Sequence, residues 1–501
     1  MSKSARELWS LLHGKRSQVI ARAERAAKFT IPEILLEHGE STDRGDGGRL
    51  WQSVGAQLVN NLATRLMLAL FAPSRPFIRL DPSDEYEAAA AQAGVSEEVL
   101  RQGLALGERK VTKTLDNLAL RPKLYELLKH LLVVGTVLAI MDRDDRIMRV
   151  LSLRHFCVKR DVAGRVHTLV IREKVERDEL PADLRAVGAA SDDPNKHDDD
   201  VEYFIVIKRE PTGRHTAKYN VEHWIDDVHV EEWDASYSED DNPYRVLTWT
   251  LADEANYGTS LVMSYEGDFA AVENASSALI VAAVLASEFR WLVNPAAGVR
   301  PEDFEESENG AYIPGNKDAV TLVNAAGEVA QAMQAQMTVI KEYVNRLGRG
   351  FIMTSAVTRD AERVTAEEIR LLAGELENGL GGGYSRLAVD LQRPLGLFLL
   401  ALNKVTINEK QIELTVVTGL DALSRNGDLE NLRGWLADIM QLQSAPPQVT
   451  EPLNLTALYK DLGSPRGIDT TPYLKSAEQI QQERDQAAAR EAAARNGEQQ
   501  Q

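Results

Sequence analysis

The chain has 501 residues and a net charge of −19, from 57 lysines and arginines against 76 aspartates and glutamates. Its length predicts two to four folding units. Tight DNA binders usually carry a basic surface, because neutralising phosphates drives their affinity, so contact with DNA is expected only at a few local basic sites.

Helical periodicity dominates the N-terminal third of the chain. Apolar residues recur at helical spacing over 4–29, which predicts one amphipathic helix there. A second helix is predicted over 49–71, with Trp51 and a row of leucines on one face. Two further helices are expected at about 95–118 and 122–132.

Between about 133 and 250 the apolar period changes to two, which is typical of β-strands. The segments 135–153, 156–175 and 202–224 each predict a strand, a turn and a second strand, with turn residues where hairpins need them. The acidic stretch 191–200 is expected to be an exposed loop. Together with the helices, these hairpins predict an α+β fold that is mainly α.

The helical period returns after Tyr257 and Gly258. One long helix is predicted over 260–290 and another over about 327–347. The stretch between them, 291–326, contains three prolines and cannot be helical throughout. Two long helices are therefore expected to flank an irregular insert.

A further helix is predicted to open at Thr365, with Glu368 completing a capping box. Three consecutive glycines later in this pattern predict a helix kink; they are Gly381, Gly382 and Gly383. A phosphate-binding loop is not supported, because no strand precedes the glycines and no Gly-Lys-Ser/Thr follows. Short helices are expected over 428–460.

Neither a membrane segment nor a disulfide is expected. The longest apolar runs, 131–141 and 278–286, are shorter than the roughly 20 residues of a membrane span. No signal peptide is apparent at the N-terminus. The single cysteine, Cys157, cannot form a disulfide within the chain and is expected to be a small buried residue.

No constellation of residues predicts catalysis, a cofactor or a metal site. The nine histidines do not cluster at ligand spacing. His223 and His229 have Asp226 and Asp227 between them, and His197 lies in the acidic loop. Weak cation binding is conceivable in that loop, but a solvated surface is the favoured interpretation. The chain is therefore expected not to be an enzyme.

Two charged stretches have more specific interpretations. Four arginines lie within a span of 18 residues that contains two glycines: Arg346, Arg349, Arg359 and Arg363. They are either a solvated linker, with Asp360 and Glu362 as ion-pair partners, or a loop that presents arginines to a polyanion. The stretch 301–308 has five acidic residues in eight. It is either a solvated face or a docking surface for basic partners.

The segment 359–395, RDAERVTAEEIRLLAGELENGLGGGYSRLAVDLQRPL, resembles the best-known block of the head-to-tail connector (portal) proteins of short-tailed double-stranded DNA phages. Other blocks are similar to that family in the same order along the chain: 52–71, 154–166, 256–268, 292–301, 310–316, 417–432 and 467–470.

The resemblance implies the portal fold, assembled as a ring of twelve subunits around a channel. It implies a virion protein at the unique capsid vertex, assembled in the host cytoplasm. The implied parts are a wing (1–259), two stem helices (260–290 and 327–347), a clip (291–326), a tunnel loop (348–364), a wing helix and return (365–425), a crown (426–474) and a mobile tail (475–501).

The implied function is a conduit for double-stranded DNA during packaging and ejection. The four arginines would face the DNA, and an acidic wall would keep the duplex centred. Terminase and then the tail adaptor would dock on the clip, with major capsid and scaffolding proteins as further partners. The implied docking residues are Arg300, Glu302, Asp303, Glu305, Glu306, Glu308 and Lys317.

Two alternatives remain open at this stage. One is a structural capsid or scaffold component without a DNA channel. The other is an enzyme acting on nucleic acid, such as a packaging motor, which would need a phosphate loop and a carboxylate pair for metal that the sequence does not offer.

Overall fold

The chain divides into two compact units, Met1–Val417 and Thr418–Gln501. The computed structural model describes most of the first unit and only positions 434 and 437 of the second, so the predicted short helices, crown and tail lie outside the described residues. The described ranges are 4–35, 50–72, 76–95, 97–180, 182–185, 187, 200–213, 216–287, 289–294, 296, 300, 302, 306, 308, 312, 319–324, 326–353, 376, 379–380, 382–405 and 412–416.

The predicted single helix over 4–29 is wrong, because the structure has two helices, α1 (Ala5–Gly14) and α2 (Ser17–Lys28). Between them Arg16 is almost completely buried. Its guanidinium donates hydrogen bonds to three backbone carbonyls in the segment 153–156. A buried charge needs such acceptors, and this tertiary demand breaks the helix where the local pattern would continue it.

The remaining N-terminal helices agree with the sequence in type and closely in position. They are α3 (Val54–Leu70), α5 (Glu97–Asn117) and α6 (Leu120–Val133). Trp51 precedes α3 and is exposed, so it does not belong to the apolar face predicted for it. The elements that were not predicted include β1 (Ile78–Pro82), α4 (Asp84–Gln92) and β13 (Ile412–Val416), of which β1 and β13 pair antiparallel.

The three predicted hairpins are confirmed as β2–β3, β4–β5 and β6–β7. One sheet has the strand order β10-β2-β3, and a larger one has the order β4-β5-β6-β7-β8, with β9 also pairing β7. The strands are β2 (Thr136–Asp142), β3 (Ile147–Leu151), β4 (Phe156–Arg160), β5 (Val166–Glu176), β6 (Asp200–Pro211), β7 (Ala217–Ile225), β8 (Val228–His229), β9 (Ala235–Ser238) and β10 (Tyr244–Thr248); the short helix α7 (Ala182–Arg185) lies between β5 and β6.

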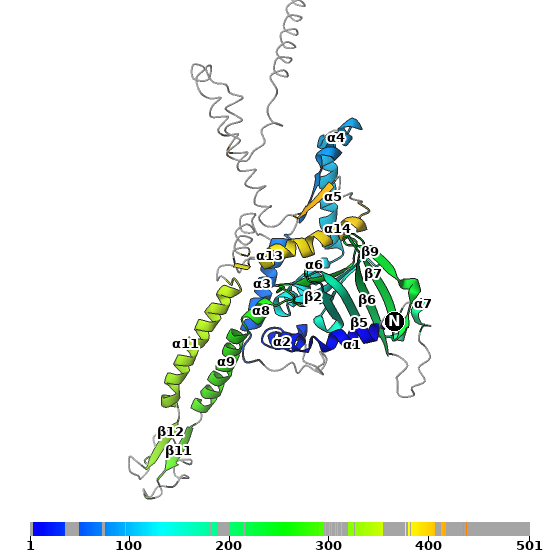
Figure 1. Ribbon diagram of the computed structural model, residues 1–501. Coiled ribbons are helices and arrows are strands. Elements are labelled where there is room, and N and C mark those ends of the chain that lie inside the picture. The colour runs from blue at the N-terminus through cyan, green and yellow to red at the C-terminus, as the bar shows by residue number, and fades with distance from the viewer. Residues whose placement is uncertain are drawn as a thin grey trace, which may run out of the picture. The chain divides into compact units, whose positions relative to one another are not determined.

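The main core lies between these sheets and the helices α3 and α6 (Figure 1). Cys157 is fully buried, as expected, and burial raises the pKa of its thiol to about 12. Gly135 joins α6 to β2 with φ +82°, and a Cβ there would lie 2.6 Å from the backbone nitrogen of Ser260. This close approach fixes the start of the next helical segment against the core.

That segment begins with α8 (Leu261–Ser264) and continues as α9 (Glu266–Ser287), so the helix predicted over 260–290 is interrupted at Tyr265 and ends earlier. The second long helix is α11 (Ala326–Gly350). The insert between them is not irregular throughout. Its ends form the antiparallel strands β11 (Phe289–Val293) and β12 (Val320–Asn324), whose β-branched and aromatic residues favour pairing.

The predicted kink at the three glycines stays a prediction, because one of them lies outside the described residues. Gly382 and Gly383 form the first turn of α13 (Gly382–Leu387), while Gly381 lies outside the described residues. The next five residues are the π-helical η8 (Ala388–Gln392), followed by α14 (Arg393–Leu402). Pro394 lacks the N–H that an α-helix would direct to residue 390, which explains a π-helical turn at this point.

Candidate functional site: the paired helices α9 and α11

The helices α9 and α11, called the helix pair below, pack side by side and end in the β11–β12 hairpin (Figure 1). The register of the two antiparallel helices is defined by one residue pair at each end. At the hairpin, Phe289 pairs with Asn324. At the opposite end, Asp268 Oδ1 lies 3.3 Å from Arg346 Nη1. The two residue numbers in each pair have nearly the same sum, so the helices stay in antiparallel register along their length.

A regular set of α11 positions forms the less exposed face of this helix. These positions are three or four residues apart and less exposed than their neighbours, which is the spacing of one helix face. The set is Val329, Met333, Gln336, Ile340, Val344 and Leu347.

Aromatic packing joins the base of the helix pair, where α9 begins and α11 ends. Phe351 lies between Tyr265 and Phe269, with ring centroids 5.7 Å away in both cases. A Cβ at Gly350 would lie 2.5 Å from the Tyr265 hydroxyl oxygen, so only glycine allows α11 to end this close to Tyr265. The base is therefore a fixed joint made of residues from both helices.

Ion pairs attach the same base to the N-terminal helices. Glu266 lies 2.7 Å from Arg25 Nε and 3.8 Å from Arg22 Nε, both on α2. Glu273 accepts a hydrogen bond of 2.9 Å from the backbone nitrogen of Trp51. These contacts join segments more than 200 residues apart, and none could be foreseen from local sequence.

The outer half of α9 exposes apolar side chains that the described part of the chain does not cover. Ile280, Val281, Val284 and Leu285 are 41%, 51%, 56% and 52% exposed. Of the α9 residues whose burial is described, only Phe269 and Val272 are buried. A helix that is apolar on all sides is normally buried, so this exposed surface is a candidate interface.

By length and composition alone, α9 could cross a membrane, which corrects the expectation that every apolar run is too short. Its partner argues for a different cover. Next to α9, α11 exposes Gln331, Gln334, Lys341 and Glu342. Lipid would leave these polar groups without hydrogen-bond partners at high energetic cost, whereas another protein surface or water can satisfy them.

Two of the four arginines singled out in the sequence lie at the base of the helix pair. Arg346 pairs with Asp268, and its guanidinium lies 4.7 Å from the centroid of the Tyr343 ring. Arg349 is exposed in the last turn of α11. Arg346 lies within the helix predicted over 327–347, and Arg349 is helical as well, because α11 runs to Gly350 and not to about 347. Arg359 and Arg363 lie outside the described residues, as does the helix predicted from Thr365.

Within the insert, the described docking candidates are all exposed: Arg300, Glu302, Glu306 and Glu308. The backbone nitrogen of Glu306 donates a 3.0 Å hydrogen bond to the carbonyl of Glu302. Asp303, Glu305 and Lys317 lie outside the described residues.

The acidic loop with His197, weighed as a weak cation site, lies outside the described residues, whereas His223 and His229 make side-chain contacts. The Tyr203 hydroxyl lies 2.6 Å from His223 Nδ1, and burial lowers the pKa of this histidine. His229 stacks on Trp224 at 4.7 Å and lies 3.0 Å from a carboxylate oxygen of Asp234. Among the described residues, no group of three or more histidines, cysteines or acidic residues could hold a metal ion.

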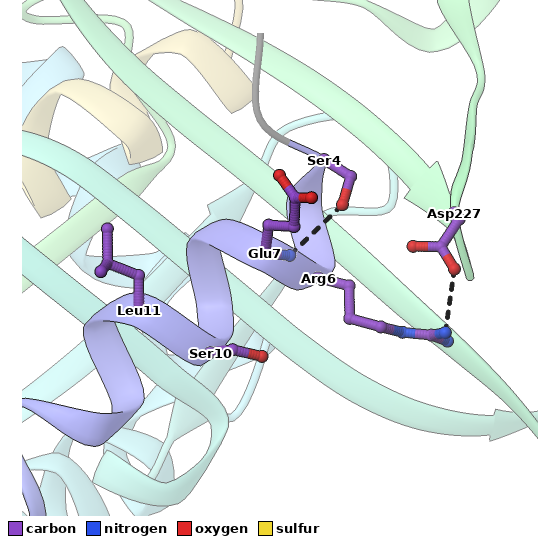
Figure 2. Close-up of a pocket in the computed structure, with 6 residues that line it drawn as sticks. All are labelled: Ser4, Arg6, Glu7, Ser10, Leu11 and Asp227. Atoms are coloured by element: carbon purple, nitrogen blue, oxygen red, sulfur yellow. Dashed lines mark hydrogen bonds and ion pairs between the residues drawn. The ribbon is translucent and has the colours of Figure 1, made fainter.

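The acidic residues between those histidines hold the N-terminal helix in place. Asp226 and Asp227 lie 3.1 Å and 2.9 Å from the guanidinium of Arg6, which also contacts Glu202 at 2.9 Å. Figure 2 shows Arg6 reaching across to Asp227 beside a pocket of about 600 Å³. This is a structural tie, and its ion pairs leave no acid–base dyad in the pocket. The pocket is lined by Ser4, Arg6, Glu7, Ser10, Leu11 and Asp227.

Comparison with known proteins relates this geometry to a family. A family model described as "Bacteriophage head to tail connecting protein" matches residues 2–474. The chain is 32% identical over 492 residues to the portal protein of Enterobacteria phage T3, covering 95% of this chain and 89% of that protein. It is 31% identical over 494 residues to the portal protein of Escherichia phage T7, with the same coverage of 95% and 89%.

A third relative, the portal protein of Pseudomonas phage phiKMV, is 32% identical over 517 residues, which cover 98% of this chain and 96% of that protein. Among solved structures, a chain in the neck of an empty gene transfer agent (GTA) particle covers 76% of this chain and 85% of its own length. Its TM-score is 0.37 and its sequence identity 13%.

Proposed function

Because the chain belongs to the bacteriophage head to tail connecting protein family, we propose that it is one subunit of a ring whose channel carries double-stranded DNA into and out of the phage head. Its role is structural, and the ring has twelve copies at the unique capsid vertex. Assembly takes place in the host cytoplasm, where the ring meets major capsid and scaffolding proteins.

The exposed apolar surface of α9 is the observation that supports the ring most directly. In a closed ring every copy has a neighbour on each side, so the same contact recurs at each interface. Ile280, Val281, Val284 and Leu285 would be buried against the adjacent copy. Each apolar side chain removed from water contributes about 1.5–3 kcal/mol when it is fully buried, and a closed ring repeats this gain at every interface.

Electron microscopy and native mass spectrometry of the purified chain test the ring. We expect a particle with a central hole and the mass of about twelve chains. A chain that stays monomeric or dimeric under all conditions would contradict the ring. A large assembly without a hole would favour a structural capsid or scaffold component instead.

We assign the parts of the chain in accordance with this function. The helix pair is the stem, assigned to 260–290 and 327–347, and the last turn of α11 extends into the range assigned to the tunnel loop. The remaining assignments are the wing (1–259), the clip (291–326), the tunnel loop (348–364), the wing helix and return (365–425), the crown (426–474) and the tail (475–501).

The arginines near the end of α11 are proposed to touch the DNA transiently. Strong phosphate binding would oppose sliding, and its strength rises with the number of cationic contacts. Arg346 is already paired with Asp268, which reduces its attraction for phosphate. The three remaining arginines therefore carry most of the proposed contact: Arg349, Arg359 and Arg363.

Replacing those three residues with alanine, R349A/R359A/R363A, tests the contact. The ring should stay intact in native mass spectrometry, while DNA packaging or retention falls. A matched control, R177A/R185A, removes two arginines from the region around α7, away from the helix pair. Unchanged packaging in the triple variant would remove the arginines from the DNA path.

The exposed acidic residues of the insert are proposed to dock terminase and later the tail adaptor. Glu302→Gln, Glu306→Gln and Glu308→Gln together should weaken both interactions, most strongly at low salt, because exposed charges are screened by ions. The control is Glu231→Gln with Glu232→Gln, two exposed glutamates outside the insert. Unchanged affinity for both partners would contradict this docking site.

A further inference from the structure

We propose that the middle of the helix pair is an electrically neutral band, along which duplex DNA slides without an ionic contact to its phosphates. This inference rests on the proposed function, because it requires the helix pair to line the channel. It concerns the chemistry of that lining and assigns the resistance to sliding to the charged groups at its ends.

The first observation is a gap in the charge pattern. In α9 the stretch Asn274–Ser287 has no ionisable side chain, and in α11 the stretch Val329–Ile340 has none either. Charged residues make up 27% of the whole chain, so two such stretches would ordinarily carry several. The polar groups that remain are amides and hydroxyls, such as Gln331, Gln334 and Thr338.

The second observation is that the two neutral stretches lie side by side, at the same position along the axis of the helix pair. The pairing of Phe289 with Asn324 and of Asp268 with Arg346 gives the antiparallel register of the helices. In this register residue 274 lies level with about residue 339, and residue 284 with about residue 329. The stretches therefore overlap in one band, about 16 Å long at 1.5 Å per residue.

Because the two neutral stretches lie side by side, the inference does not depend on the orientation of each subunit in the ring. Whichever of the two helices faces the channel, the band presents no charge. The acidic wall expected from the sequence is therefore not present at this height. Charges return only beyond the band, with Lys341, Glu342, Arg346 and Asp268 toward the base.

The physical consequence is a lining that neither holds nor repels DNA electrostatically. B-DNA carries one negative charge per about 1.7 Å of its axis, so about ten phosphate charges face the band at any moment. One lysine per subunit within the band would place a full ring of cations opposite these phosphates. One glutamate per subunit would oppose the entry of DNA.

The test introduces charge at two exposed positions that lie nearly level, Gln334 on α11 and Ala278 on α9. The variants are Gln334→Lys and Ala278→Lys. Their controls are Gln334→Met and Ala278→Met, which add a side chain of similar length without charge. Ring formation is followed by native mass spectrometry, and affinity for a short DNA duplex is measured over a range of salt concentrations.

At the position that faces the channel, lysine should raise affinity for the duplex by about tenfold or more at low salt. It should also steepen the decrease of affinity with salt, by about 0.9 in logarithmic slope for each phosphate neutralised. The same variant should slow packaging, and the methionine variants should behave as the native ring. If a lysine variant fails to assemble, Gln331→Lys or Asn274→Lys, also at exposed positions of the band, replaces it.

Intact rings in which lysine at neither position changes affinity or its salt dependence would overturn the neutral band. So would methionine variants that match the lysine variants, because the effect would then be steric. A native chain that forms no ring would instead overturn the proposed function, so the two failures are distinguishable.

Discussion

The described part of the first unit outside the helix pair is called the body below. The body and the helix pair are both rich in apolar residues, but the body buries them and the helix pair leaves several exposed. In the body, Leu128 of α6 and Val137 of β2 are fully buried by other parts of the same chain. In the helix pair, Val284 and Leu285 stay more than half exposed. An apolar pattern thus shows that a side chain will be covered, but not whether its own chain or another copy covers it.

Charges differ between the two regions in a related way. In the body, ion pairs connect distant segments, as between Arg154 and Glu24 at 2.7 Å. In the helix pair, ionisable groups are confined to the ends. The body uses charge to fix one tertiary arrangement, whereas the middle of the helix pair has no ionisable side chain.

Val284→Asp tests this difference between the two regions most directly, and we expect it to have the largest effect. The isolated chain should fold as before, because residue 284 is exposed and surface changes usually alter stability by less than about 0.5 kcal/mol. The ring should be lost, because a buried unpaired carboxylate would recur at every interface. Native mass spectrometry measures this, with Val284→Ile as control. A ring that survives Val284→Asp would place this surface outside the interface.

The converse change, Leu128→Ala, should destabilise the chain itself. This side chain is fully buried in α6, and removing it leaves a cavity, at a cost of about 2–5 kcal/mol. Denaturant unfolding followed by circular dichroism measures the loss, with Val284→Ala as the matched change on the exposed helix. A similar loss of unfolding free energy in both variants would contradict the difference in burial between the two regions.

The body should also be sensitive to acid. Burial lowers the pKa of His130 to about 4 from the usual 6.5. The folded state therefore keeps this histidine neutral while the unfolded state takes up a proton, so stability falls as pH decreases from 6.5 to 4. The full loss from this group is about 3 kcal/mol.

Stability measured across that pH range should have a shallower slope in His130→Leu than in the native chain. His167→Gln, a change at an exposed histidine, should keep the native slope. Equal slopes in the native chain and in His130→Leu would show that other groups cause the acid sensitivity.

The smallest expected effect is on the ion pair at the base of the helix pair. Arg346 and Asp268 are partly exposed, with side chains 54% and 18% accessible. Such pairs contribute less than about 1 kcal/mol. A double-mutant cycle with Arg346→Gln and Asp268→Asn measures the coupling. A coupling of several kcal/mol would mean that this joint is held far more rigidly than its exposure indicates.

Local patterns were enough to predict much of the fold. The hairpins at β2–β3, β4–β5 and β6–β7 follow from period-two alternation with turn residues between the strands. The two long helices follow from their helical period, although the boundaries shift by a few residues. Arg346 was placed correctly within the second long helix, whereas Arg349 was placed beyond it, although it lies in its last turn.

The sequence by itself determined the order and type of most elements, because side-chain periodicity and turn chemistry act over a few residues. Only the tertiary structure decided the break at Arg16, the pairing of β1 with β13 and the alignment of the helix pair. Each of these depends on partners more than 70 residues away, and no local preference encodes such a distance. The buried guanidinium of Arg16 needed carbonyls that only the folded chain supplies, and so it overrode the helix that its neighbours favour.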